Sequence, residues 1–215
     1  CGTSVEETVT SSCGVKFQRP KKVYIIGFAS EGTADIPWGA SDTEFWGFNE
    51  LYRRYTNLND FTRWFELHTV TFDQPNAVPG YFAPDEWLKH GALLRQLAKM
   101  MPVYTPLIAT IPGAKVYPLA KIHALPHGAY HAGSFDWMVA FAIAEGFKEI
   151  HVCGADFARG GEPISARPCL EYWLGVAEGR GIKTVVHGGD CFRIYHLMRS
   201  DCAYGFEPFA LVEDA

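Results

Sequence analysis

Short apolar runs alternate with helical segments along this chain, and this alternation constrains the fold more than any other feature. The clearest runs are Lys22–Ala29, Lys148–Asp156 and Lys183–His187, all rich in Val and Ile. Strands that are apolar throughout are typical of parallel sheets whose two faces are both covered by helices. The sequence therefore predicts an α/β fold, namely a Rossmann-like parallel sheet with helices on both faces.

Capping residues and apolar spacing indicate the remaining elements. Ser134 is the expected N-cap of one helix, and Gly146 is the expected end of that helix. Residues 1–20 read as an irregular arm, and residues 21–215 read as a single Rossmann-like nucleotide-binding domain. We expect further strands at 44–49, at 63–68 and from 103, short extended structure from 115, and helices over 84–100, 135–145 and 167–179.

Composition excludes several classes of protein. A 48% hydrophobic share, a 20% charged share and a net charge of −5 describe a globular domain without general attraction for nucleic acid. No apolar run approaches the roughly 18 residues that span a bilayer. The chain also begins without a signal-peptide pattern, so we expect a cytoplasmic protein with no membrane partner. The six cysteines form no CxxC pair, and a structural zinc site is not expected.

Glycines and polar residues follow the expected strands, where ligands bind in parallel sheets. Gly27 and Ser30 follow the first strand, in a loop whose N–H groups could receive a phosphate or could simply form a tight turn. Asn49 could hydrogen-bond a ribose or a base, or cap a helix. Gly154 and Asp156 end a strong strand, where a carboxylate suits a ribose hydroxyl, a sugar, a metal or a turn.

Histidines supply the candidate acid–base chemistry. His127 and His131 precede the helix that begins near Ser134, where helical N–H groups and a hydroxyl favour an anion. Either histidine could act as a general base near neutral pH. The alternative is an N-cap flanked by two surface histidines. His68, at another strand end, could line the same site or be structural.

The block from Ala132 to Phe157, with its Gly154-x-Asp156-Phe157 ending, resembles the core of the bacterial family 42 sialyltransferases. Gly27, Ser30 and the Phe48-Asn49 pair fall in matching order. The resemblance covers roughly residues 22–190 and extends to the hydroxymethylpterin pyrophosphokinase-like group. Uncharacterised bacteriophage proteins resemble the chain further, in the segment from Arg167 to Ile182.

The resemblance implies a site as well as a fold. In the sialyltransferases, a strand-end Asn, a helix-start Ser and the Gly-x-Asp loop hold a cytidine nucleotide without a metal. By match, Asn49, Ser134, Gly154 and Asp156 inherit that role. The family also inserts a lid that carries tyrosines and a histidine base, but here only the segment 158–166 fills that interval, with no Tyr and no His. His127, His131 or His68 would have to substitute.

Three hypotheses follow. The first is a nucleotide-sugar-dependent glycosyltransferase that needs no cofactor, in which His131, His127 or Asp156 deprotonates the acceptor and the helix start holds the leaving phosphate. The second is a Mg²⁺-dependent pyrophosphokinase-like enzyme, for which no second well-placed acid is visible. The third is a non-catalytic nucleotide-binding or virion structural module. The expected partner is a nucleotide or nucleotide sugar with an unassigned acceptor, in the host cytoplasm or a virion if the protein is phage-encoded.

Overall fold

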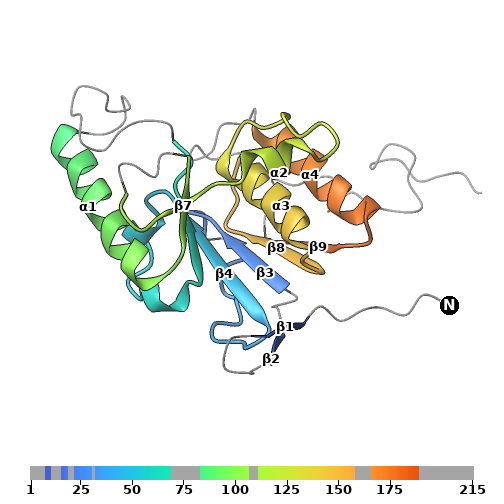
Figure 1. Cartoon of the computed structure of the whole chain (residues 1–215), viewed down its shortest axis with the longest axis horizontal. Coiled ribbons are helices and arrows are strands. Elements are labelled where there is room, and N and C mark those ends of the chain that lie inside the picture. Colours follow the sequence, from blue (N-terminus) through green and yellow to red (C-terminus); the bar gives the residue numbers. More distant parts are fainter. Residues whose placement is uncertain are drawn as a thin grey trace, which may run out of the picture.

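A computed structural model describes residues 8–10, 16–18, 22–30, 32–68, 83–106, 111–157 and 166–188. Within these residues, seven strands form one sheet in the order β7-β6-β5-β4-β3-β8-β9, and each neighbouring pair is parallel (Figure 1). This confirms the predicted parallel sheet. The strands are β3 Lys22–Ile26, β4 Thr43–Phe48, β5 Arg63–Phe65, β6 Val103–Thr105, β7 Lys115–Val116, β8 Glu149–Cys153 and β9 Lys183–His187.

Helices cover both faces of the sheet, as predicted. Helix α1, Pro84–Met100, lies on one side, whereas α2, Leu119–His123, α3, Ser134–Glu145, and α4, Arg167–Gly179, lie on the other (Figure 1). Two 3₁₀ turns, Leu51–Arg53 and Leu58–Asp60, connect β4 to β5. The bounds of α1, α3 and α4 agree with the sequence prediction within a residue.

Alternate side chains of the central strand enter two separate cores. Val23 and Ile25 pack with α3 and α4, whereas Tyr24 and Ile26 belong to the core that includes α1. Successive strand residues point to opposite faces of a sheet. Because both faces are covered, the β3 run has to be apolar without interruption, and this is the pattern visible in the sequence.

The strand order creates a point where the direction of winding reverses. The sheet starts with β3 in its interior and extends through β4 and β5 to β7, and the chain then returns to place β8 on the other side of β3. Ligands of open α/β sheets bind outside the carboxyl ends of the strands at such a point. Because all these strands are parallel, Gly27, Asn49 and Gly154 follow strand ends on one edge, and α3 begins at that edge.

Two local predictions were wrong. The arm predicted to be irregular contains an antiparallel pair of short strands, β1 Thr8–Thr10 and β2 Lys16–Gln18. The N-cap of α3 is Gly133 rather than Ser134, which is the first helical residue. The carboxylate of Asp136 accepts the N–H groups of Ala132 at 2.8 Å and Gly133 at 2.9 Å. The Ser134 hydroxyl is therefore not used to cap the helix.

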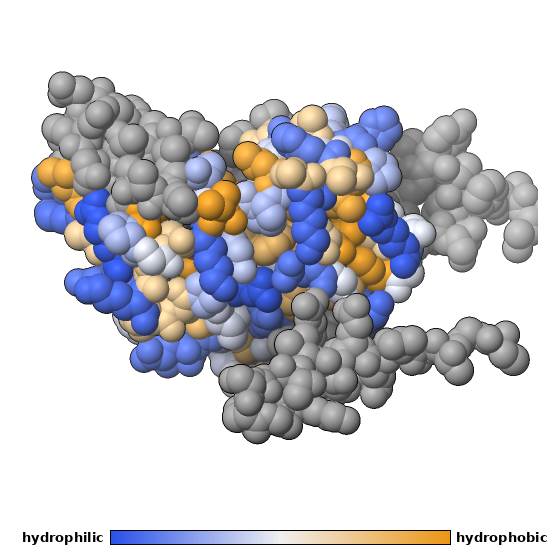
Figure 2. All heavy atoms as spheres, viewed as in Figure 1, coloured by the Kyte–Doolittle hydropathy of each residue, from blue (hydrophilic) through white to orange (hydrophobic). Residues whose placement is uncertain are grey.

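The surface of the described elements mixes polar and apolar residues, as is usual for a globular domain. On the face drawn in Figure 2, hydrophilic residues are interspersed with hydrophobic ones over the described elements. Large exposed apolar side chains are scattered over α1, β7 and α2: Leu88, Met100, Val116 and Leu119. Scattered exposure of this kind needs no special explanation. None of the described helices is long and apolar enough to span a bilayer.

Candidate functional site

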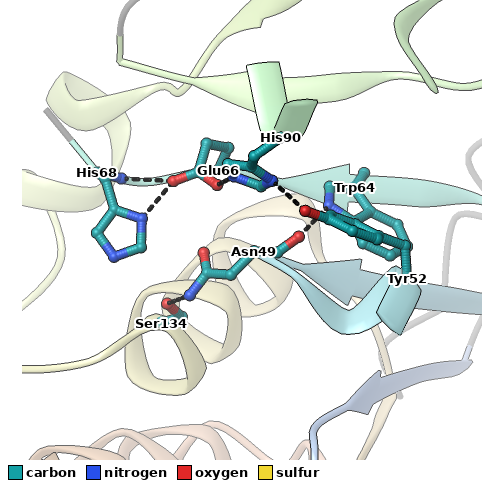
Figure 3. A network of polar contacts seen from close by, with 7 residues as sticks. All are labelled: Asn49, Tyr52, Trp64, Glu66, His68, His90 and Ser134. Atoms are coloured by element: carbon teal, nitrogen blue, oxygen red, sulfur yellow. Dashed lines mark hydrogen bonds and ion pairs between the residues drawn. The ribbon is translucent and has the colours of Figure 1, made fainter. Parts of the chain in front are cut away.

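A hydrogen bond joins the end of β4 to the start of α3. The amide Nδ2 of Asn49 donates to Ser134 Oγ at 3.3 Å (Figure 3). Asn49 adopts a left-handed backbone conformation with φ 47°, which Asn tolerates better than most residues. Its backbone is held on both sides, because its N–H donates to Phe65 O at 2.9 Å and its carbonyl accepts from Trp64 Nε1 at 3.2 Å. The amide of Asn49 is thus placed rigidly beside Ser134.

The other amide atom of Asn49 is unsatisfied. Asn49 Oδ1 is buried and has no hydrogen-bond partner among the described residues. Buried polar atoms of this kind are rare and call for a specific explanation. A donor group of a bound ligand would satisfy this oxygen.

The glycines at this edge serve close packing of the chain on itself. Two N–H groups of the loop after β3 donate to the end of β8 and to the residue after it, Gly27 N to Cys153 O at 2.8 Å and Ala29 N to Gly154 O at 2.9 Å. A Cβ atom at Gly27 would lie 2.3 Å from Phe135 Cζ, and one at Gly154 would lie 2.7 Å from Ala29 O. Packing accounts for both glycines, and a nucleotide-binding role for either stays a prediction.

The buried ring of Phe135, at the start of α3, contacts the residues that follow or end β4 and β8. Its ring contacts Phe48, which precedes Asn49, at 5.0 Å between centroids, and Phe157, which follows Asp156, at 6.3 Å. Phe135 is buried in the core beneath α3. The ends of β4 and β8 and the start of α3 are therefore neighbours, so the predicted residues Asn49, Ser134 and Asp156 gather at one edge.

Ser30 lies in a tight turn that packs toward β9 and not toward β4. Its carbonyl accepts the N–H of Thr33 at 3.3 Å and the hydroxyl of Thr33 at 2.8 Å. A Cβ atom at Gly32 in the same loop would lie 2.1 Å from His187 O at the end of β9. The loop therefore contacts β9, which is three strands from β4. A nucleotide-binding role for Ser30 stays a prediction.

The side chain of His131 is buried, in contrast to the alternative prediction of two surface histidines. Its side chain is 2% exposed and lies between the rings of Trp137, at 3.5 Å, and Trp173, at 4.9 Å, with both stacks nearly parallel. Its Nδ1 lies 3.2 Å from Asp136 Oδ2. This burial between α3 and α4 favours a structural role for His131. His127 is exposed and lies beside Tyr172 of α4. Catalytic roles for either histidine stay predictions.

A buried acid–imidazole network follows the neighbouring strand β5. Glu66 is fully buried, and its Oε1 accepts hydrogen bonds from His68 Nδ1 and, at 3.1 Å, from the His68 N–H. Its Oε2 lies 2.7 Å from His90 Nε2, and His90 Nδ1 lies 2.9 Å from the Tyr52 hydroxyl (Figure 3). Two strand-end residues, one helix and one 3₁₀ turn thus contribute to a single network.

The network holds Glu66 ionised. Burial opposes ionisation, yet hydrogen bonds from His68 and His90 lower the pKa of Glu66 to about 2. The hydrogen bond to Glu66 raises the pKa of His68, against the opposing effect of burial. Burial raises the pKa of the Tyr52 phenol and that of the neighbouring Glu50. A negative charge therefore lies in the interior beside partly exposed His68.

His68 was among the residues predicted from the sequence, whereas its partners Glu66 and His90 were not. Two signals were available: Glu66 and His68 alternate after an apolar strand, and His90 falls on the apolar stripe of α1 with Trp87, Leu94 and Leu97. No group of three or more His, Cys, Asp or Glu among the described residues is placed to hold a metal ion. The segment 158–165, where the family lid was expected to be reduced, lies outside the described residues.

Comparison with solved structures identifies the architecture. The sialyltransferase CstII from Campylobacter jejuni, in complex with CMP, superposes over 82% of this chain and 83% of its own, with a TM-score of 0.56 and 15% identity. The chain shares the fold of these sialyltransferases. A CST-II complex with CMP and a trisaccharide acceptor gives a TM-score of 0.56 over 80% of this chain and 83% of that one, at 16% identity.

The monofunctional α-2,3-sialyltransferase Cst-I from Campylobacter jejuni matches over 90% of this chain and 83% of its own, with a TM-score of 0.52 and 13% identity. No protein-family model and no curated protein sequence matches the chain. At these identities, the structural likeness establishes the Rossmann-like α/β fold expected from the resemblance in sequence.

Proposed function

We propose that the protein is a nucleotide-sugar-dependent glycosyltransferase that binds its nucleotide at the carboxyl edge of the sheet. The observation that carries the proposal is the Asn49–Ser134 contact at the reversal point of the strand order. The fold is shared with sialyltransferases whose structures contain CMP. The unsatisfied Asn49 Oδ1 supports the proposal further, because an amino or hydroxyl group of a nucleoside would donate to it.

The start of α3 suits the leaving phosphate. The first N–H groups of a helix and its dipole favour an anion, and the Ser134 hydroxyl lies there without a capping role. Charge that develops on the departing nucleotide would be stabilised by these groups in the transition state. The acceptor would be a sugar hydroxyl that displaces the nucleotide at the anomeric carbon, and Asp156, His127 and His131 are the bases predicted from the sequence.

The resemblance also supports finer proposals. A bacteriophage origin, a place in the host cytoplasm and association with a virion rest on the segment from Arg167 to Ile182. No metal or organic cofactor is part of the proposed reaction. Mg²⁺-dependent pyrophosphoryl transfer and nucleotide binding without catalysis are the alternatives that the following experiment separates.

Thermal unfolding with CMP, CDP, UDP, GDP or ATP, each with and without Mg²⁺, tests the proposal. A ligand that binds only the folded state at 100 times its Kd stabilises it by about 2.7 kcal/mol. We expect a metal-independent rise in Tm with CMP. The rise should be lost in Asn49→Gly, which removes the amide without straining the left-handed backbone, and in Ser134→Ala.

Ser41→Ala is the matched control, because Ser41 is exposed just before β4, at the opposite edge of the sheet. It should bind CMP as the unaltered protein does. A shift that appears only with ATP and Mg²⁺ would favour the pyrophosphokinase-like alternative. The absence of a shift with every nucleotide would refute both enzymatic hypotheses.

A further inference from the structure

Glu66 is a buried charge beside the proposed nucleotide site, and the fold alone gives no reason for it. A carboxylate in the interior is costly unless it is paired and hydrogen-bonded. Here both oxygens are used, Oε1 by His68 and Oε2 by His90. The two imidazoles approach from different elements, the end of β5 and the middle of α1. The arrangement is built around the carboxylate.

The hydrogen-bond directions can be assigned along the network. The Tyr52 hydroxyl lies 2.9 Å from His90 Nδ1, at the end of the network away from His68. Because an ionised carboxylate only accepts hydrogen bonds, His90 Nε2–H donates to Glu66 Oε2. On the other side, His68 Nδ1–H donates to Glu66 Oε1. Proton exchange at His68 is thereby assigned to Nε2.

His68 is the member of the network that can reach a substrate. Its side chain is 32% exposed, whereas those of Glu66 and His90 are 0% exposed. Asn49 and His68 follow adjacent parallel strands, and the Asn49 N–H bonds to Phe65 O at the end of β5. In Figure 3, the His68 ring and the Asn49 amide both extend from these strand ends toward the start of α3.

We propose that His68 is the general base that accepts the proton of the acceptor hydroxyl, and that Glu66 is its positioning residue. The inference rests on the proposed glycosyltransferase function. The O–H bond of the acceptor breaks, and its proton moves to His68 Nε2. The acceptor oxygen forms a bond to the anomeric carbon, the bond from that carbon to the phosphate oxygen breaks, and its electron pair leaves with the nucleotide. Glu66 stays ionised and stabilises the imidazolium that forms.

The surrounding charges set the pH dependence of this step. The hydrogen bond to Glu66 raises the pKa of His68 above 6.5, burial opposes the rise, and the nearby Glu50 adds to it. His90 contacts Glu66 from the side opposite His68, and Tyr52 contacts His90 in turn. A base must be neutral to accept a proton, so activity should increase with pH along a limb whose midpoint lies above 6.5.

The test follows CMP release from CMP-sialic acid between about pH 5 and pH 9, across the range where histidine titrates. In His68→Gln, kcat should fall by about 100-fold or more and the limb should disappear. KM for the donor and the rise in Tm with CMP should both be retained. In Glu66→Gln, kcat should fall less, and the limb should move to lower pH because the carboxylate that raised the pKa of His68 is gone. Imidazole in solution should restore part of the activity of His68→Gly.

His123→Gln is the matched control, because His123 is exposed on α2. It should keep both the rate and the limb. Wild-type kcat in His68→Gln, an unshifted limb in Glu66→Gln, or loss of the CMP shift in His68→Gln would each overturn the proposal while nucleotide transfer stands. A wild-type protein that binds CMP but releases none from CMP-sialic acid also overturns the role of His68. Failure of the proposed function is distinct, because the wild-type protein would then show neither a CMP shift nor release.

Discussion

Replacing the buried Glu66 by Gln should weaken the folded state in a pH-dependent way. The pKa of Glu66 is about 2 in the folded protein, compared with an ordinary value of 4.5. Each pKa unit corresponds to about 1.4 kcal/mol, so ionised Glu66 contributes roughly 3 kcal/mol to the free energy of unfolding at pH 7. Breaking a buried ion pair by removing one partner typically costs about 3–5 kcal/mol, and this range includes the value derived from the pKa of Glu66.

The sign of the pH dependence follows from the lowered pKa. The unfolded chain binds a proton at Glu66 below about pH 4.5, whereas the folded protein binds it only near pH 2. The contribution is therefore complete above about pH 5 and is lost as the pH falls toward 2. At pH 3, about 1.4 kcal/mol should remain, so the wild-type protein and Glu66→Gln should differ less there than at pH 7.

Urea unfolding at pH 7 and pH 3 measures both values. The other carboxylates titrate in both proteins, and a third measurement at pH 5, below the titration of His68, separates the contribution of Glu66 from that of His68, whose pKa Glu66 raises. Asp85→Asn is the control, because Asp85 is an exposed acid on α1 that pairs with Lys89 at the surface. An equal difference at the two pH values, or a difference below about 1 kcal/mol at pH 7, would refute the reasoning.

Two further predictions concern other parts of the site. Gly27→Ala should destabilise the protein by about 1–3 kcal/mol or more in urea, because its Cβ would lie 2.3 Å from the buried Phe135 ring. Gly175→Ala, on the exposed face of α4, should instead stabilise it by up to about 1 kcal/mol, and equal effects would contradict the packing account of Gly27. His131→Gln should lower the free energy of unfolding by about 1–3 kcal/mol and leave the pH limb of CMP release unchanged. A loss of kcat at unchanged stability would show instead that His131 acts in catalysis.

The fold was readable from the sequence because its signals are local. An apolar run such as Lys22–Ala29 predicts a strand covered on both faces, and Pro84 and Gly146 mark a helix start and a helix end within a residue. The N-cap of α3 was misassigned because Gly133 and Ser134 both suit the position. The backbone N–H groups that Asp136 accepts decide between them.

The site was less readable because its contacts join distant segments. Asn49 and Ser134 were predicted by resemblance, but their hydrogen bond spans 85 positions of sequence. Glu66 and His90 lie 24 positions apart, and neither lies in a recognisable motif. A pairing of this kind depends on how α1 packs on the sheet, and periodicity within either element carries no information about it.

Among the described residues near this edge, two imidazoles pair with a buried acid, His131 with Asp136 and His68 with Glu66, and their surroundings indicate different roles. Asp136 accepts two backbone N–H groups at the start of α3 in addition to His131, so its burial is explained by helix capping. Glu66 accepts one backbone N–H, and its remaining bonds come from His68 and His90. A buried ion pair is often no more stable than a well-packed apolar replacement, so stability alone does not account for this carboxylate. An ionised acid that orients a partly exposed imidazole suits proton transfer, and for this reason we assign the Glu66 pair rather than the Asp136 pair to the proposed reaction.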